Sequence, residues 1–167
     1  NGLLVRLGSG GGLMTVDEYG DFEMRFEWKI TEYGNSGVIY RIGTTGPYPW
    51  HTGPEYQILD NGHHPDGKSP LTSAGSNYAV DAPVKDVTKP VGEWNEGRII
   101  AKGNHVEHWL NGVKVVEYEI GSANWKAHVQ ASKFGKIPPY GTVKRGYIAL
   151  QDHESVVVYR NLKIKTL

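Results

Sequence analysis

Alternation of apolar and charged residues predicts the first clear strand at residues 22–30. In this segment, FEMRFEWKI, every second side chain from Phe22 to Ile30 is apolar, and the four between them are charged. A period of two places one face of a strand against a core and the other towards water. We therefore expect a half-buried β-strand here.

The same kind of pattern continues along the rest of the chain. Further strands are predicted at SGVIYRI, EYQILD, GRIIAK, HVEHWL, VKVVEYE, GYIALQDH and VVVYRNLKIK. Gly103-Asn104 and Asn111-Gly112 are expected to form tight hairpin turns, because both residue types tolerate positive φ. Residues 122–134 show only loose helical spacing and predict at most one short helix. Many antiparallel strands without alternating helices indicate an all-β sandwich or barrel.

Residues 60–94 contain no sustained period and are rich in Gly, Pro, Asn and Asp. A loop of this length within a compact domain is usually functional. Its segment 60–66 brings carboxylates and imidazoles together, but their spacing matches no known calcium or zinc motif. An Asx-rich turn is therefore preferred to a metal site.

Composition narrows the function classes. The 167 residues fit one domain, and 18 basic residues balance 18 acidic ones. Nucleic acid and anionic membranes are disfavoured as partners, because phosphate binding needs a cationic surplus. Apolar runs are too short to span a membrane. The absence of cysteine excludes disulfides and thiolate chemistry, and no serine-hydrolase, Walker or dinucleotide motif is present; the glycine run 8–12 merely precedes a strand.

Polar side chains that alternate out of the predicted core supply the candidate chemistry. If the strands share one sheet face, that face carries Glu27, Arg41, Glu55, Gln57, Gln151 and His153. Carboxylates, a cation, amides and an imidazole together are typical of a site for polar ligands. Ordinary cross-strand ion pairs on a wet face remain the alternative.

Aromatic residues extend this candidate site. Tyr48, Trp50, Tyr78 and Tyr140 lie in loops, where rings either stack on a sugar or cover an edge of the core. Trp50 and Tyr78, with Tyr40 of the strand 36–42, are predicted to bind substrate. His108 alternates with core residues and is expected to be a hydrogen-bonded core histidine.

The order and spacing of several segments closely resemble the 3-keto-disaccharide hydrolase domain family. These segments are GDFEMRFEWKI, NSGVIYR, GPEYQILDN, KPVGEWNEGRIIAKGNHVEHWLNGVKVVEYE, SKFG and GYIALQDHESVVVYRNLKIK. The resemblance covers nearly the whole chain. It implies a two-sheet antiparallel jelly roll of the concanavalin A-like lectin/glucanase kind, in agreement with the strand pattern. The chain 1–167 is then one such domain that lacks the additional first strand that family members carry.

The resemblance also implies a reaction and a location. It implies cleavage of glycosides whose C3 hydroxyl has been oxidised to a ketone, and a secreted or periplasmic protein with a lipid anchor as an option for the full-length precursor. A C3 ketone acidifies the C2 proton, so a base can remove it and expel the C1 substituent before water adds back. We expect His153 or Glu55 as base, Glu27 as partner acid, and Arg41, Gln57 and Gln151 as enolate and hydroxyl binders.

Two other functions stay open at this point. A conventional glycosidase would use Glu27 and Glu55 as a carboxylate pair, about 5 Å apart for retention or about 6.5–9.5 Å for inversion. A lectin-like module would bind carbohydrate without cleaving it. Neither the residues nor their spacing requires a cofactor, although a divalent metal is left open, and a monomer and a homodimer are both consistent with the pattern.

Overall fold

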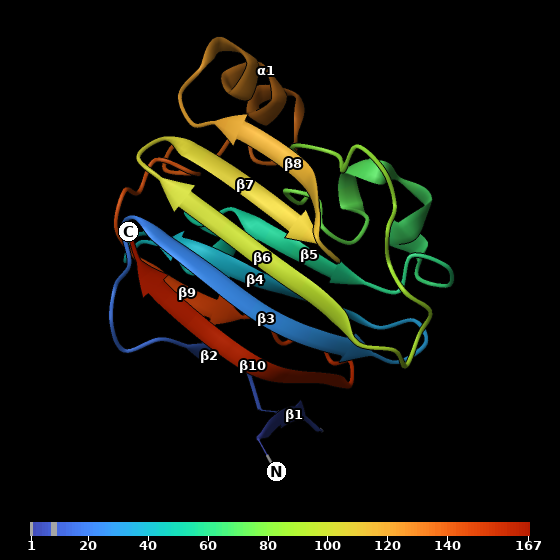
Figure 1. Cartoon of the computed structure of the whole chain (residues 1–167). Helices are drawn as coiled ribbons and strands as arrows, with labels where there is room; N and C mark the ends of the chain where they lie inside the picture. Colours follow the sequence, from blue (N-terminus) through green and yellow to red (C-terminus); the bar gives the residue numbers. More distant parts are fainter. Residues whose placement is uncertain (1, 8–9) are drawn as a thin grey trace.

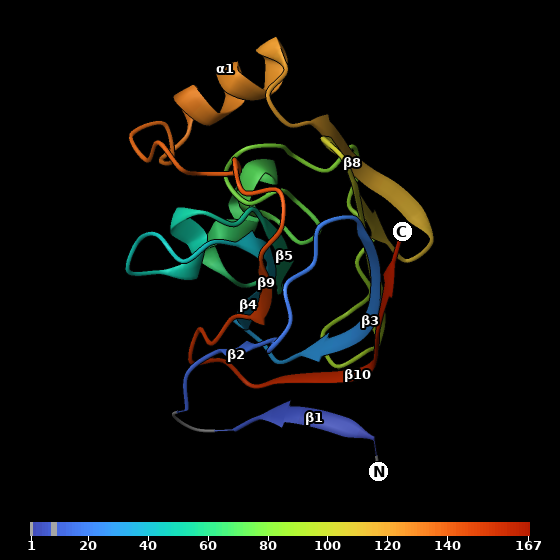
Figure 2. The same cartoon turned by 90° about the vertical axis from the view of Figure 1, so that its left-hand side faces the viewer.

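The computed structural model describes residues 2–7 and 10–167 and shows two antiparallel sheets packed face to face (Figures 1 and 2). Gly8 and Ser9, part of the glycine run noted above, lie outside the described residues. The six-stranded sheet has the order β1-β10-β3-β6-β7-β8, and the four-stranded sheet has the order β2-β9-β4-β5. The predicted all-β, two-sheet antiparallel sandwich is confirmed.

The strands are β1 (Leu3–Arg6), β2 (Leu13–Met14), β3 (Phe22–Ile30), β4 (Asn35–Ile42), β5 (Glu55–Leu59), β6 (Asn95–Lys102), β7 (His105–Leu110), β8 (Val113–Glu119), β9 (Tyr147–Leu150) and β10 (Val157–Thr166). The helices are α1 (Ala123–Ala131) and three short 3₁₀ turns, η1 (Pro49–His51), η2 (Pro65–Lys68) and η3 (Pro70–Thr72). None of the helices in the described part of the chain is long and apolar enough to cross a membrane.

Strand alternation builds the core between the sheets. All five apolar residues of β3 are at most 4% exposed, and their charged neighbours face outward. Val38 and Tyr40 of β4 and Tyr56 and Ile58 of β5 oppose them from the other sheet. Burial of this apolar surface is the main stabilising contribution to the fold.

His108 of β7 is buried in this core, as predicted. Its Nε2 lies 2.8 Å from the Tyr40 hydroxyl and its Nδ1 3.0 Å from the Gly75 carbonyl oxygen. Burial lowers the pKa of His108 to about 4, so the ring is neutral at physiological pH.

Turns and the helix also follow the sequence pattern. Asn111 and Gly112 both have positive φ, 49° and 79°, and join β7 to β8. Helix α1 begins after Ser122, whose side-chain oxygen accepts a hydrogen bond from the Trp125 amide at 3.1 Å. The long segment between β5 and β6 holds η2 and η3 and packs beside β5, where Asn77 bridges to Tyr56.

Candidate active site

A cavity of about 430 Å³ lies on the face of the four-stranded sheet that points away from the core. Its floor comes from β4, β5 and the segment after β9, and loops near η1 and after α1 project beside it on the left of Figure 2. Six of the predicted site residues line it, namely Glu55, Gln57, Gln151, His153, Trp50 and Tyr78. The structure therefore brings together most of the residues that the strand pattern selected.

Glu55, the first residue of β5, is the buried acid of this cavity. It is only 4% exposed. Burial raises the pKa of its carboxyl to about 8, an effect that Lys133 opposes and Asp66 increases. At neutral pH the side chain is therefore mainly protonated and can donate a proton, as general acids in active sites do.

Gly37 of β4 provides the space in which the Glu55 carboxyl sits. A Cβ atom at position 37 would lie 2.1 Å from Glu55 Oε1 and 2.8 Å from its Cδ. Any larger residue would displace the carboxyl group. The local choice of glycine is therefore explained by the close approach of Glu55.

Amide side chains surround the acid. Gln57 is 1% exposed. With Nε2 on the side of Glu55, it donates to the Ser36 carbonyl oxygen at 3.0 Å and to Glu55 Oε1 at 3.3 Å; with the amide turned, it donates to Asn35 Oδ1 at 3.3 Å. Gln151 is fixed by its backbone amide, which donates to the Gly37 carbonyl oxygen at 2.8 Å. Its Oε1 is buried and has no hydrogen-bond partner among the described residues, so this acceptor lacks the partner that buried polar atoms usually have.

Aromatic rings form one wall of the cavity. Tyr48 and Trp50 are stacked, with ring centres 5.3 Å apart and planes 5° apart, and Trp50 also packs near Phe134. Tyr78 donates from its hydroxyl to Asp66 Oδ2 at 3.1 Å. A rigid apolar wall beside amides and an acid is the composition that binds the two faces of a sugar ring. Tyr140, by contrast, is buried in the core.

Lys133 is a cavity residue that strand alternation did not reveal. It follows α1, and its Nζ lies 4.3 Å from the centre of the Tyr78 ring. Burial lowers the pKa of Lys133, while Glu55 and Asp66 act in the opposite direction. Asp152 also lines the cavity, but it is engaged by Arg6 at 2.7 Å and by the Gly11 amide at 2.8 Å.

Glu27 does not reach the cavity, contrary to the expectation that it shares a face with Glu55. It lies in β3, on the outward face of the six-stranded sheet, and accepts hydrogen bonds from Arg160 at 2.6 and 2.8 Å. Hydrogen bonds from Asn161 and Arg160 lower the pKa of Glu27. Alternation identifies residues on one face of a strand, but it does not show which strands share a sheet.

Arg41 and Tyr40 of β4 also lie outside the cavity. Arg41 has φ of 51° at a shift in the β4–β9 register, so its side chain leaves the alternating pattern. It is 1% exposed and donates to the carbonyl oxygens of Gly20 and Gly103. Tyr40 is fully buried and bonds to His108 in the core. The predicted substrate contacts of both residues are therefore not supported by their positions.

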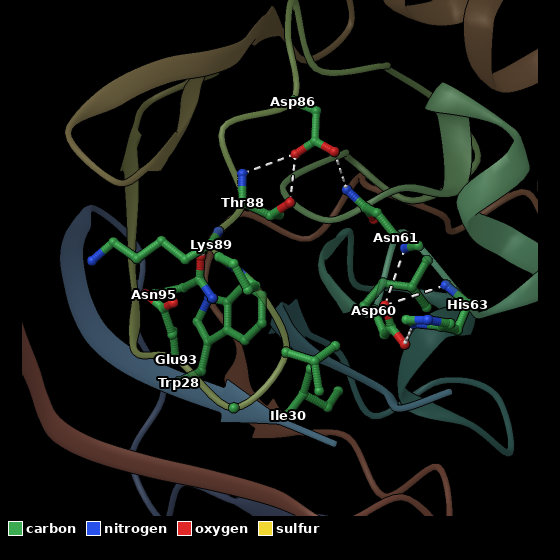
Figure 3. A pocket seen from close by; sticks show the side chains of 15 residues that line it. Trp28, Ile30, Asp60, Asn61, His63, Asp86, Thr88, Lys89, Glu93 and Asn95 are labelled. Carbon is green, nitrogen blue, oxygen red and sulfur yellow. Dashed lines mark hydrogen bonds and ion pairs between the residues drawn. The ribbon is translucent and has the colours of Figure 1, made fainter. Parts of the chain in front are cut away.

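A second cavity, of about 580 Å³, lies between the end of β3 and the loop 60–94 (Figure 3). Most of its polar side chains already have hydrogen-bond partners, although the buried Trp28 Nε1 has none among the described residues. Asp60 accepts from the Gly62 amide and contacts His63, and Asp86 accepts from Thr88 and Asn61 (Figure 3). Asp60 also accepts from the Tyr33 amide. Segment 60–66 thus forms a capped turn, and the carboxylates of Asp60 and Asp86 are already held by neighbouring donors.

Among the described residues, one cluster has the geometry to hold a metal ion: His105, Glu107 and Glu117. They come from β7 and β8 and do not line the Glu55 cavity. Lys114 Nζ lies 2.7 Å from Glu117 and 3.6 Å from Glu107, so a cation already neutralises these carboxylates. This surface cluster therefore adds nothing to the candidate active site.

Comparison with known proteins agrees with this fold. The sequence profile of the 3-keto-alpha-glucoside-1,2-lyase-like domain matches residues 1–165. The chain belongs to this family. The family assignment made from the sequence segments is confirmed. The jelly-roll fold is shared with a carbohydrate-binding module from Bacillus subtilis, with a TM-score of 0.57 and 12% identity. That comparison covers 99% of this chain and 96% of the module.

Two other proteins are more similar in sequence to this chain than the Bacillus subtilis module is. A 3-keto-disaccharide hydrolase from Bacteroides thetaiotaomicron is 34% identical over 96% of the chain, and the chain spans 63% of that relative's length. A crystal structure from Parabacteroides distasonis, provisionally described as a glycosyl hydrolase, superposes with a TM-score of 0.91 at 36% identity. That comparison covers 99% of this chain and 80% of the other.

Proposed function

We propose that the chain cleaves the glycosidic bond of 3-keto glycosides in the cavity around Glu55. The observation that carries this proposal is a buried carboxyl group, its pKa raised by burial, at the floor of a cavity that also offers an imidazole, amides and an aromatic wall. Family membership and the name of the Bacteroides relative support the same class of reaction.

The residues in the cavity fit an elimination followed by hydration. His153 takes the C2 proton, and the electron pair of the C2–H bond forms an enolate with the C3 carbonyl. Collapse of the enolate makes the C1–C2 double bond and expels the C1 oxygen, which takes the proton of Glu55. Water then adds at C1 and returns a proton to Glu55, while His153 returns its proton to C2. The sum is hydrolysis.

The position of Glu27 disfavours a conventional two-carboxylate glycosidase. Glu27 and Glu55 face opposite sides of the sandwich, and Asp152, the other acid in the cavity wall, is held by Arg6 and backbone amides. A retaining or inverting mechanism needs two free carboxyl groups across the scissile bond. The geometry thus favours chemistry that uses one carboxyl group.

Aglycone release from a 3-keto glucoside and from its unoxidised parent, each with and without EDTA, tests the proposal. We expect release from the keto sugar alone. Loss of release in EDTA would add a divalent metal to the mechanism. Cleavage of the parent glycoside at an equal rate would contradict the proposed chemistry. Sugar binding without release from either compound would leave a lectin-like module instead.

A further inference from the structure

Lys133 presents a cation to the same cavity without an anionic partner in contact. The residue as a whole is exposed, yet its Nζ lies 4.3 Å from the centre of the Tyr78 ring and 5.2 Å from that of Phe134. Within the described chain, no carboxylate oxygen lies within 4.0 Å of Nζ and no hydrogen-bond acceptor is assigned to it. Aromatic faces can hold an ammonium group in place without neutralising its charge.

The charges of Lys133 and Glu55 affect each other across the cavity. Each changes the other's pKa in the direction that favours the charged form. They do not form an ion pair, although both line the cavity. A cation and a proton donor that face one cavity from different elements suit a substrate that develops negative charge at one atom and loses a leaving group at another.

We propose that Lys133 binds the C3 oxygen of a 3-keto glycoside and stabilises the negative charge that forms there when the C2 proton is removed. This inference rests on the proposed function. The enolate needs a positive group, and Arg41, which the sequence had suggested for this task, is buried against Gly20 and Gly103. Lys133 takes that role, and the C3 oxygen returns to a carbonyl when the C1 oxygen leaves with its electron pair.

Deuterium exchange separates enolate formation from bond cleavage. The probe is 1,5-anhydro-3-keto-glucitol, a ketone with a C2 proton but no aglycone at C1, incubated in D₂O and followed by ¹H NMR after subtraction of the buffer rate. The wild-type protein should speed exchange at C2. Lys133→Met should slow it by about 100-fold or more, as expected for loss of one group that stabilises an oxyanion, and Lys133→Arg should restore much of the rate.

Lys136→Met serves as the matched control, because Lys136 is an exposed lysine of the same loop that does not line the cavity. It should exchange at the wild-type rate. A second measurement needs no substrate. Because Lys133 lowers the pKa of Glu55, ¹³C NMR titration should show a higher Glu55 pKa in Lys133→Met than in the wild type. This readout also shows that the variant is folded.

Three results would overturn the assignment. In the first, Lys133→Met exchanges normally but releases aglycone slowly, which would place Lys133 at the leaving group. In the second, the Glu55 pKa is the same in both proteins. In the third, the wild-type protein neither exchanges the probe nor cleaves any 3-keto glucoside, and then the proposed function fails as well. In the first two, wild-type activity shows that the proposed function survives without this role for Lys133.

Discussion

The position of the Glu55 carboxyl group depends on Gly37, which has no side chain. This carboxyl group occupies the space above Gly37, and a Cβ atom there would lie 2.1 Å from Oε1. The φ of Gly37 does not lie in the left-handed region, so alanine is compatible with the backbone at this position. Substitution should therefore move the acid and leave the fold intact.

We expect Gly37→Ala to lower kcat on a 3-keto glucoside by about 10-fold or more, because a displacement of about 1 Å can cost a large part of a rate. Thermal unfolding should show a change of no more than a few degrees. Gly20→Ala is the control, since a Cβ at position 20 makes only ordinary contacts, the nearest at 3.5 Å. Full activity in Gly37→Ala would show that the position of Glu55 is unimportant.

At the residue scale, the sequence was informative where a side chain alternates on a regular strand. Glu55 and Gln57 lie on the cavity side of β5, as period two predicts. The Arg41 side chain does not follow this alternation, because a register shift with positive φ turns it away from the cavity. Lys133 was missed because it follows a helix, and only the return of the chain from α1 brings it beside Tyr78. The segment SKFG, which contains Lys133, was part of the family resemblance. It was the one sequence feature that pointed to this part of the chain.

At the scale of elements, Asn111 in the turn between β7 and β8 also links this hairpin to another part of the chain. The Asn111 backbone has φ of 49°, and its side chain makes three hydrogen bonds of 2.8 Å. These reach the Glu96 amide, the Val87 carbonyl oxygen and Asn95 Oδ1. Asn111 therefore ties the hairpin to the end of the long loop that precedes β6.

Asn111→Gly should cost roughly 2–3 kcal/mol in the free energy of unfolding, through loss of these hydrogen bonds. Asn111→Ala should cost about 1 kcal/mol more, since alanine must also adopt the left-handed backbone conformation. Urea denaturation of Asn111→Gly measures the cost of the lost hydrogen bonds. The difference between Asn111→Ala and Asn111→Gly measures the cost of placing alanine in the left-handed backbone conformation. Equal costs in the two variants would show that the backbone conformation contributes little.

Local pattern predicted the elements better than their association. The hairpin turns at 103–104 and 111–112, the short helix and the eight strands β3 to β10 occur where residue type and alternation place them, whereas β1 and β2 were not predicted. The assignment of β3 to a different sheet from β4 and β5 was not visible, because alternation carries no information on strand order. Because the strand order was unknown, Glu27 was wrongly predicted to lie in the site.

For the whole molecule, Glu55 and His108 are the buried groups that dominate the pH dependence of stability between about pH 4.5 and 8. Glu55 has its pKa raised from 4.5 to about 8, so folding binds a proton between these values and stability falls as pH rises through them. His108 has its pKa lowered from 6.5 to about 4, so stability falls as pH drops through that range. Between about pH 4.5 and 6.5 the two effects oppose each other.

We predict a stability plateau between about pH 4.5 and 6.5 and a fall of about 2 kcal/mol between pH 6.5 and 8, at about 1.4 kcal/mol per pH unit for one proton. In Glu55→Gln that fall should vanish, and stability should rise from pH 4.5 to 6.5 because only His108 then titrates. Urea denaturation across this pH range checks both curves. Parallel curves for the two proteins above pH 6.5 would mean that Glu55 ionises normally.

The central claim is that Glu55 donates the proton in cleavage of a 3-keto glycoside. It is tested most directly by kcat/KM for aglycone release against pH, with the wild type, Glu55→Gln and Glu27→Gln. The wild-type value should decline above about pH 8 as Glu55 loses its proton. Glu55→Gln should be slower by about 100-fold or more without that decline, and Glu27→Gln should follow the wild type. Wild-type rates in Glu55→Gln, or a comparable loss in Glu27→Gln, would contradict this account.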